Sequence, residues 1–283
     1  MSMTFKITLT LLILIIISII ALPHILTTAG LHPKFTYDFD VPNFENKKAL
    51  IIATNHGTLN KPGETNGKPT GLFLSELSIP YFDLLKTNMS IDIASINGGF
   101  IPIEPVPWFI KAPEDKKFEK DKKLMNKLKN SLSINDLDFT DYDVVFLSGG
   151  WGAAYDLAQS PVMATKVSEA YYGERTAVIG GVCHGVLGLV NAKDKEGNTL
   201  IAGRRMTGVT DKQVKELGIE ITPLHPETEL RKAGALFESQ TAFRDLFATH
   251  VVVDDEQRFV TGQNQNSGLE TAHRMMQVIA DRG

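Results

Sequence analysis

Residues 177–185 read AVIGGVCHG, and this stretch decides the fold that the sequence predicts. Its apolar and glycine residues before Cys183 are typical of a strand buried in a sheet, and the segment from Cys183 to Asn191 begins a predicted helix. Gly181 and Gly185 flank the cysteine as in a nucleophile elbow, a tight turn between strand and helix. Such a turn places the sulfur at a helix N-terminus, where the thiolate is favoured over the thiol. The pattern therefore predicts a nucleophilic Cys183.

The alternative for Cys183 is an inert, packed thiol. It is the only cysteine in the chain, so no internal disulfide can form and the fold must be held by packing. A buried structural thiol is the more common fate of a single cysteine. The glycines around it and the residues at the ends of other strands favour the reactive interpretation.

Short apolar runs alternate with amphipathic segments along the chain. Because continuous apolar strands separated by helices are typical of parallel sheets, we expect a doubly wound α/β fold, with a mainly parallel sheet and helices on both faces. A helical stretch interrupted at Pro80, a lysine-rich helix, a strand pair and a final helix capped by Ser267 complete the prediction. The predicted strands are residues 49–54, 91–95, 143–148, 176–182, 249–254 and 258–261; the helices are 71–86, 115–130, 211–217 and the segment after Ser267.

The N-terminal segment differs from the rest of the chain. Residues 7–22 are almost all Ile, Leu and Thr, follow Lys6, and reach spanning length only if the apolar stretch continues through Leu26. We expect a signal-anchor with Lys6 inside and the folded domain on the extracytoplasmic side. A signal peptide cut before Gly30, with secretion of the domain, is the alternative. The predicted organisation is residues 1–29 as anchor or signal, 30–46 as linker and 47–283 as one α/β domain.

Composition excludes several classes of function. A formal net charge of -4 gives no basic face, so we expect no nucleic-acid partner. His56, His225 and His250 are dispersed and lack a metal-ligand spacing, and no glycine-rich phosphate loop is present. We therefore expect neither a metal nor a cofactor.

Polar and glycine residues follow two further predicted strands. Asn97 and Gly99 come after one strand, and Gly149, Gly150 and Trp151 come after another. Because the carboxyl ends of parallel strands form one crevice, we expect these residues to line a substrate pocket beside Cys183. Their backbone amides are suited to an oxyanion hole.

The ordered motifs resemble the ThiJ/PfpI family of the class I glutamine amidotransferase-like fold. The resemblance runs from about residue 49 to the end and is carried by residues 71–81, 94–105, 141–157, 183–185, 207–210 and 260–264. Within the family, the chain is most similar to the branch of glyoxalase III-like enzymes, which are also described as protein deglycases and holding chaperones. Dimers are common in the family, so a homodimer is a further expectation.

The resemblance implies roles for individual residues. Cys183 is the nucleophile, His184 its neighbouring acid or base, and Glu76 the carboxylate near the sulfur. Trp151 stands where the branch often has histidine. The carboxylate that would orient His184 is either missing or moved to Asp211 or Glu216.

These observations predict a cysteine-dependent enzyme for small reactive carbonyls, acting as a glutathione-independent glyoxalase or a deglycase in stress protection. A cysteine amidase or peptidase, acting on an amide, is the alternative within the same fold. Two non-catalytic alternatives remain, namely a holding chaperone and a binding domain that has lost its acid and base groups.

Overall fold

The computed structural model describes residues 3–36, 40–61 and 63–282, and its centre is a seven-stranded sheet. The strand order is β10-β11-β7-β6-β1-β4-β5, and all neighbours are parallel except the β10–β11 hairpin. The doubly wound fold predicted from the sequence is confirmed. The strands are β1 Lys48–Ala53, β4 Ser90–Ser95, β5 Leu132–Ser133, β6 Val144–Leu147, β7 Val178–Val182, β10 Val251–Val253 and β11 Phe259–Gly262.

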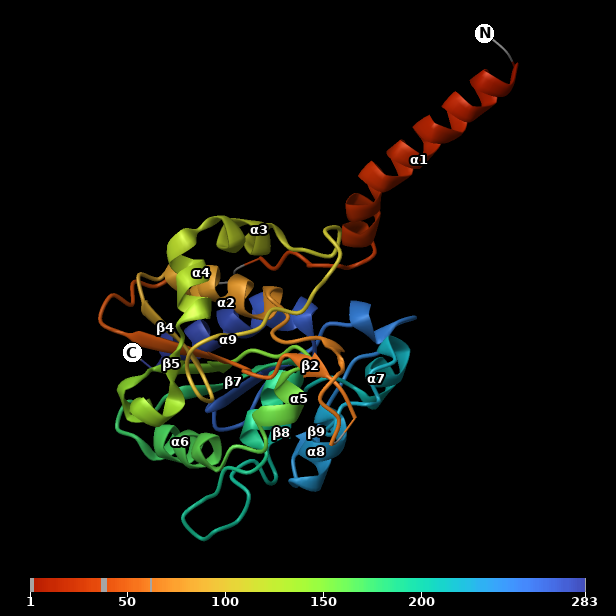
Figure 1. Ribbon diagram of the computed structural model, residues 1–283. Helices are drawn as coiled ribbons and strands as arrows, with labels where there is room; N and C mark the ends of the chain where they lie inside the picture. Colours follow the sequence, from red (N-terminus) through yellow and green to blue (C-terminus); the bar gives the residue numbers. More distant parts are fainter. Residues whose placement is uncertain (1–2, 37–39, 62, 283) are drawn as a thin grey trace.

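Helices cover both faces of this sheet (Figure 1). The face that carries Ile51 packs against α2, α9, α3 and α4, and the opposite face, which carries Ile52, packs against α5, α6 and α8. Alternate residues of one strand thus enter two separate cores, which explains why the strands read as unbroken apolar runs. The helices are α2 Ser75–Leu85, α3 Pro113–Lys120, α4 Lys122–Lys129, α5 Ala153–Asp156, α6 Pro161–Tyr172, α7 Asp211–Leu217, α8 Pro226–Lys232 and α9 Gly268–Asp281.

Two small sheets lie outside the central one. One pairs β2 with β3, and the other pairs β8 with β9. Short 3-10 turns link several elements. The bounds are β2 Thr58–Leu59, β3 Lys68–Pro69, β8 Arg205–Met206, β9 Leu236–Phe237, η1 Ile134–Asp136, η2 Phe139–Asp141, η3 Cys183–Leu189, η4 Asp245–Phe247 and η5 Gln265–Ser267.

Several helix predictions were wrong in detail. The lysine-rich segment forms two helices, because Asp121 ends α3 with extended backbone and caps α4 by accepting from the amides of Lys123 and Leu124. Helix α2 continues through Pro80, and the hydroxyl of Ser267 accepts from His250 N–H instead of capping α9. The helix expected after Cys183 is the 3-10 helix η3.

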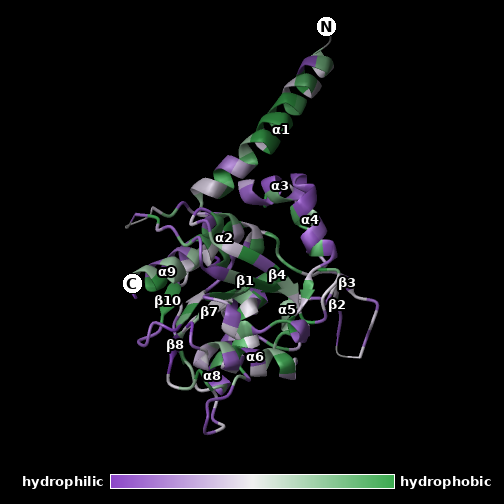
Figure 2. Cartoon of the chain, turned by 90° about the vertical axis from the view of Figure 1, so that its left-hand side faces the viewer, coloured by the Kyte–Doolittle hydropathy of each residue, from purple (hydrophilic) through white to green (hydrophobic). Residues whose placement is uncertain are grey.

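Helix α1 (Met3–Thr28) projects from the domain, and none of its residues is buried (Figures 1 and 2). It is long and apolar enough to cross a membrane, a test that a signal sequence also passes. The chain joins the domain directly after the helix. Leu31 is only 2% exposed, His32 N–H donates to Asn266 Oδ1 at 2.8 Å, and His32 Nε2 lies 2.6 Å from Ile110 O. The first described part of the expected linker is therefore packed against the domain.

Candidate active site

Cys183 sits on a strained turn at the carboxyl end of β7. Its φ of 58° lies in the left-handed region, which a residue with a side chain rarely adopts. A Cβ atom on Gly181 or on Gly185 would collide with Leu147 O at the end of β6. Glycine on both sides of the cysteine is thus required by the close approach of β6, and the turn holds the sulfur in one place.

Glu76 reaches the sulfur from the first turn of α2. Its side chain is 1% exposed and lies close enough to Cys183 for the thiol to influence the pKa of the carboxyl group. Backbone groups of Gly149 and Gly150 also approach the carboxyl group, and a Cβ on Gly149 would collide with Glu76 Oε2. The carboxyl group is therefore held between the thiol and the loop that follows β6.

Burial decides the protonation state of this pair. It raises the pKa of Glu76 to about 8, so the carboxyl group is mostly protonated at neutral pH. Burial and the neighbouring charge of Glu76 also raise the pKa of the Cys183 thiol, although backbone contacts from Gly150 and His184 lower it. Near neutral pH the pair therefore favours the state in which both the thiol and the carboxyl group keep their protons. A thiolate stabilised by a helix N-terminus, as the sequence suggested, is not what this environment favours.

His184 is a neutral base beside the thiol. Its Nδ1 lies 3.4 Å from Cys183 Sγ. Burial and the nearby His225 lower the pKa of His184 to about 3, so the imidazole carries no charge near neutral pH. Its Nε2 is buried and has no hydrogen-bond partner among the described residues.

The expected acidic partner of His184 is not supplied by either candidate. Asp211 accepts from the Thr228 hydroxyl through Oδ2, and Glu216 accepts from Asp245 N–H through Oε2. Both carboxylates serve contacts between neighbouring loops and helices. An imidazole, that of His225, lies in the surroundings of His184 instead.

The predicted pocket residues fall into two groups. Gly149 and Gly150 lie against Glu76, and Trp151 follows them, but its N–H donates to Glu104 Oε2 at 3.4 Å. Asn97 and Gly99 lie in an exposed turn, where Asn97 N–H donates to Asn55 Oδ1 and Gly99 exchanges backbone hydrogen bonds with Ser131. None of their hydrogen bonds reaches Cys183 or Glu76.

Sequence reasoning missed Glu104 and His225. Glu104 is 5% exposed, accepts from the Thr70 hydroxyl at 3.3 Å and raises the pKa of Glu76 through its charge. Burial raises its own pKa to about 7. An acidic residue between Ile103 and Pro105, inside a motif already noted, was the available signal. His225 carried no local signal, because the fold alone brings it near His184.

Among residues 3–36, 40–61 and 63–282, no group of three His, Cys, Asp or Glu side chains could hold a metal ion. The chemistry of the described site is that of a thiol, two carboxyl groups and two imidazoles.

The match to the DJ-1/PfpI family covers residues 71–277. The chain belongs to this family. Glyoxalase 3 of Candida albicans is 30% identical over an alignment of 237 positions, which covers 80% of this chain and 95% of that protein. Glutathione-independent glyoxalase HSP31 of Saccharomyces cerevisiae is 26% identical over 242 residues, covering 82% of this chain and 98% of the relative. These DJ-1/PfpI relatives are enzymes.

Solved structures of the family agree with the fold. Rapid Encystment Protein 24 kDa of Francisella tularensis has a TM-score of 0.74 and 32% identity, over 82% of this chain and 99% of that one. Glyoxalase III of Candida albicans has a TM-score of 0.71 and 28% identity, over 83% and 96% of the two chains. The recognition of the family from its motifs is confirmed.

Proposed function

We propose that this DJ-1/PfpI protein is a glutathione-independent glyoxalase that converts a small 2-oxoaldehyde and water into a 2-hydroxy acid. The observation that carries the proposal is the contact of Glu76 and His184 with Cys183, the one sulfur placed on a strained turn. The relatives that carry this activity in their names align with most of the chain.

In the first step, the sulfur of Cys183 bonds to the aldehyde carbon. The thiol proton is transferred to the aldehyde oxygen while neutral His184, whose Nδ1 lies 3.4 Å from the sulfur, orients the thiol, and a hemithioacetal forms. Backbone groups of Gly150 and His184 approach the sulfur, so their N–H groups are placed to stabilise negative charge on that oxygen.

In the second step, the carboxylate form of Glu76 removes the proton from the former aldehyde carbon and returns it to the neighbouring carbon. The hydroxyl proton moves between the two oxygens, so the product is a thioester of a 2-hydroxy acid. Water then hydrolyses the thioester, which releases the acid and restores the thiol. A base with a pKa of about 8 suits this role, because it is strong enough to take a proton from carbon and still ionises near neutral pH.

The site supports amide hydrolysis less well. Expulsion of an amine requires a proton from an imidazolium, and an imidazolium is stabilised by a buried carboxylate. The pKa of His184 is lowered to about 3, and its Nε2 has no partner among the described groups. Glyoxalase chemistry needs only the neutral imidazole.

The test is lactate formation from methylglyoxal without added glutathione. We expect Cys183→Ala to lose activity by a factor of a thousand or more while its circular dichroism spectrum stays unchanged. Activity that survives in Cys183→Ala, or that requires glutathione, would refute the proposal. Equal suppression of client aggregation by the wild type and by this variant, without any turnover, would instead indicate a holding chaperone.

We further propose that α1 anchors the enzyme in a membrane with Lys6 on the cytoplasmic side and the domain outside the cytoplasm. No residue of the helix is buried, residues 3–20 are exposed, and Lys6 in its first turns would stay in the cytoplasm with the N-terminus. Membranes washed with alkaline carbonate should retain the chain. A mature protein that begins at Gly30 by mass spectrometry would show a cleaved signal instead.

A further inference from the structure

The foot of α1 is surrounded by aromatic and lysine side chains. Pro23 and Thr27 of α1 line a mostly apolar cavity of about 330 Å³ together with Phe109, Lys34, Lys111 and Lys116. These side chains come from the segment after α1 and from the region around the start of α3, so separate parts of the chain meet at the helix end.

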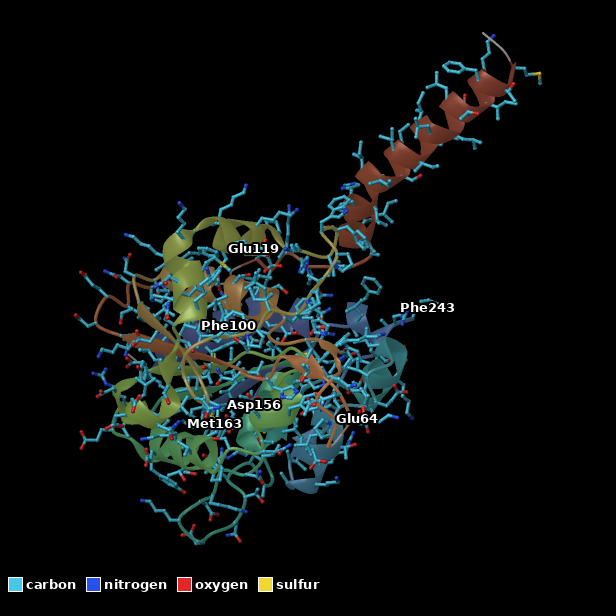
Figure 3. The ribbon with its side chains drawn as sticks, in the orientation of Figure 1. Glu64, Phe100, Glu119, Asp156, Met163 and Phe243 are labelled. Carbon is cyan, nitrogen blue, oxygen red and sulfur yellow. The ribbon has the colours of Figure 1, made fainter. Side chains whose placement is uncertain are left out.

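A second aromatic group flanks the same place. Gly30, just beyond α1, lies against Phe247 of η4. The segment before η4 carries Phe243, which is 97% exposed and points away from the domain on the side where α1 leaves it (Figure 3). Trp108, next to Phe109, is 51% exposed. We call Lys34, Trp108, Phe109, Lys111, Lys116 and Phe243 the collar.

Single exposed apolar side chains are ordinary, but aromatics gathered with lysines are typical of the membrane interface. The 26 residues of α1 span about 39 Å, against a hydrocarbon core of about 30 Å, so the end of an inserted α1 would lie at headgroup level. Four residues of the collar, Lys34, Phe109, Lys111 and Lys116, line the cavity at that end.

Charge favours anionic lipid as the neighbour of the collar. Three lysines and one glutamate, Glu114, line the cavity. Lys111 is paired with Glu119 at 2.5 Å, whereas the side chains of Lys34 and Lys116 are exposed. A phosphate group at the cavity mouth would meet ammonium groups, and the acyl chains would meet the apolar wall.

We propose that the collar seats the domain on a phospholipid bilayer, with its aromatic rings at the boundary between headgroups and acyl chains and its lysines on anionic headgroups. This inference rests on the proposed membrane insertion of α1. It adds that the folded domain itself contacts the lipid.

The test uses the full chain in nanodiscs and the two tryptophans of the protein. Trp151→Phe leaves Trp108 in the collar, and Trp108→Phe leaves Trp151 near the active site. With lipids brominated in the acyl chains, we expect the emission of Trp108 to fall at least twofold and that of Trp151 to stay unchanged. Equal emission changes of the two tryptophans would refute the proposal that the collar contacts the lipid.

A charge variant tests the lipid class. In Lys34→Gln/Lys116→Gln, we expect the enrichment of anionic over zwitterionic lipid around the protein to fall roughly fivefold or more. The matched control is Lys193→Gln/Lys195→Gln, in the exposed loop after η3 at the end of the molecule opposite α1 (Figure 1), and it should leave the enrichment unchanged. Equal enrichment in both variants would contradict the assignment of the lysines.

Failure of the anchor and failure of the collar give different results. Release of the chain by alkaline carbonate would overturn the insertion of α1 and the collar with it. Retention of the chain without quenching of Trp108 would overturn the collar alone.

Discussion

Cys183 and Glu76 occupy one buried site that accommodates a single negative charge more readily than two. Each group raises the other's tendency to keep its proton, because their charges would repel in a place that water hardly reaches. The two groups therefore titrate as a pair. Nucleophile and base are coupled in this way, and single substitutions should separate their contributions.

Glu76→Gln should separate thiol reactivity from turnover. The amide is close in size and can still donate a hydrogen bond, but it removes the charge that opposes thiolate formation. We expect the pKa of the Cys183 thiol to fall, so that iodoacetamide reacts faster than with the wild type at pH 9, where Glu76 of the wild type is ionised. Glyoxalase activity should fall at least a hundredfold, because the base is gone. A slower alkylation would contradict this account of the pair.

Glu104→Gln should shift the pH dependence of turnover. The charge of Glu104 raises the pKa of Glu76. Since the carboxylate form of Glu76 is the proposed base, wild-type kcat/KM should rise with pH, with an inflection near pH 8 and a plateau above about pH 9. The variant should reach its plateau at lower pH with a similar maximal rate, measured between pH 5.5 and 9.5. An unchanged inflection point would show that Glu104 does not act on the base.

Stability should also depend on pH through Glu76. Its folded pKa of about 8 exceeds the unfolded value of about 4.5, so the folded state binds more protons between these values and the free energy of unfolding falls as pH rises. His184 acts in the opposite direction only below about pH 6.5, since its folded pKa is lowered to about 3. Between pH 6.5 and 8 the effect of Glu76 is therefore not offset by His184.

In that window we expect urea unfolding of the wild type to lose up to about 1.4 kcal/mol per pH unit, and Glu76→Gln to show a smaller slope. Glu104 is common to both proteins, so it cancels in the comparison. Parallel slopes would mean that Glu76 is ionised in the folded protein throughout this range.

At the scale of elements, the contact between β6 and the elbow should govern stability. A Cβ on Gly185 would collide with the backbone oxygen of Leu147, whereas a Cβ on Gly188 would meet only side-chain atoms, of Leu147 at 3.0 Å and of Met163 at 3.5 Å. We expect Gly185→Ala to lower the free energy of unfolding by about 3 kcal/mol and Gly188→Ala by under about 1 kcal/mol. Urea denaturation measures both, and equal losses would show that β6 can move away.

The sequence predicted the sheet because β1, β4, β6 and β7 are buried on both faces and therefore read as apolar runs. The sequence predicted an interruption at Pro80, but α2 continues through this residue. Packing against α9 stabilises the helix at a position where proline alone would end it. The glycine pattern located Cys183. The surroundings of the sulfur, with Glu104 and His225, depend on contacts between distant segments that no local pattern encodes.

At the scale of the whole molecule, the catalytic domain should be independent of α1. The family match begins at residue 71, and relatives covered almost entirely by the alignment match only about four fifths of this chain. We expect a chain that starts at Gly30 to be released from membranes and to keep kcat/KM for methylglyoxal within about twofold. A larger loss, confirmed on a folded sample by circular dichroism, would indicate that α1 supports the site.

The junction after α1 has one more consequence. Only two residues, Ala29 and Gly30, separate the end of α1 from the buried Leu31, and His32 is bonded to two distant parts of the domain. An enzyme joined to its anchor by a long flexible linker samples many orientations above a bilayer. Here the short connection would restrict the orientation of the domain relative to α1. Cys183 would therefore stay at one height above the bilayer and in one orientation relative to it.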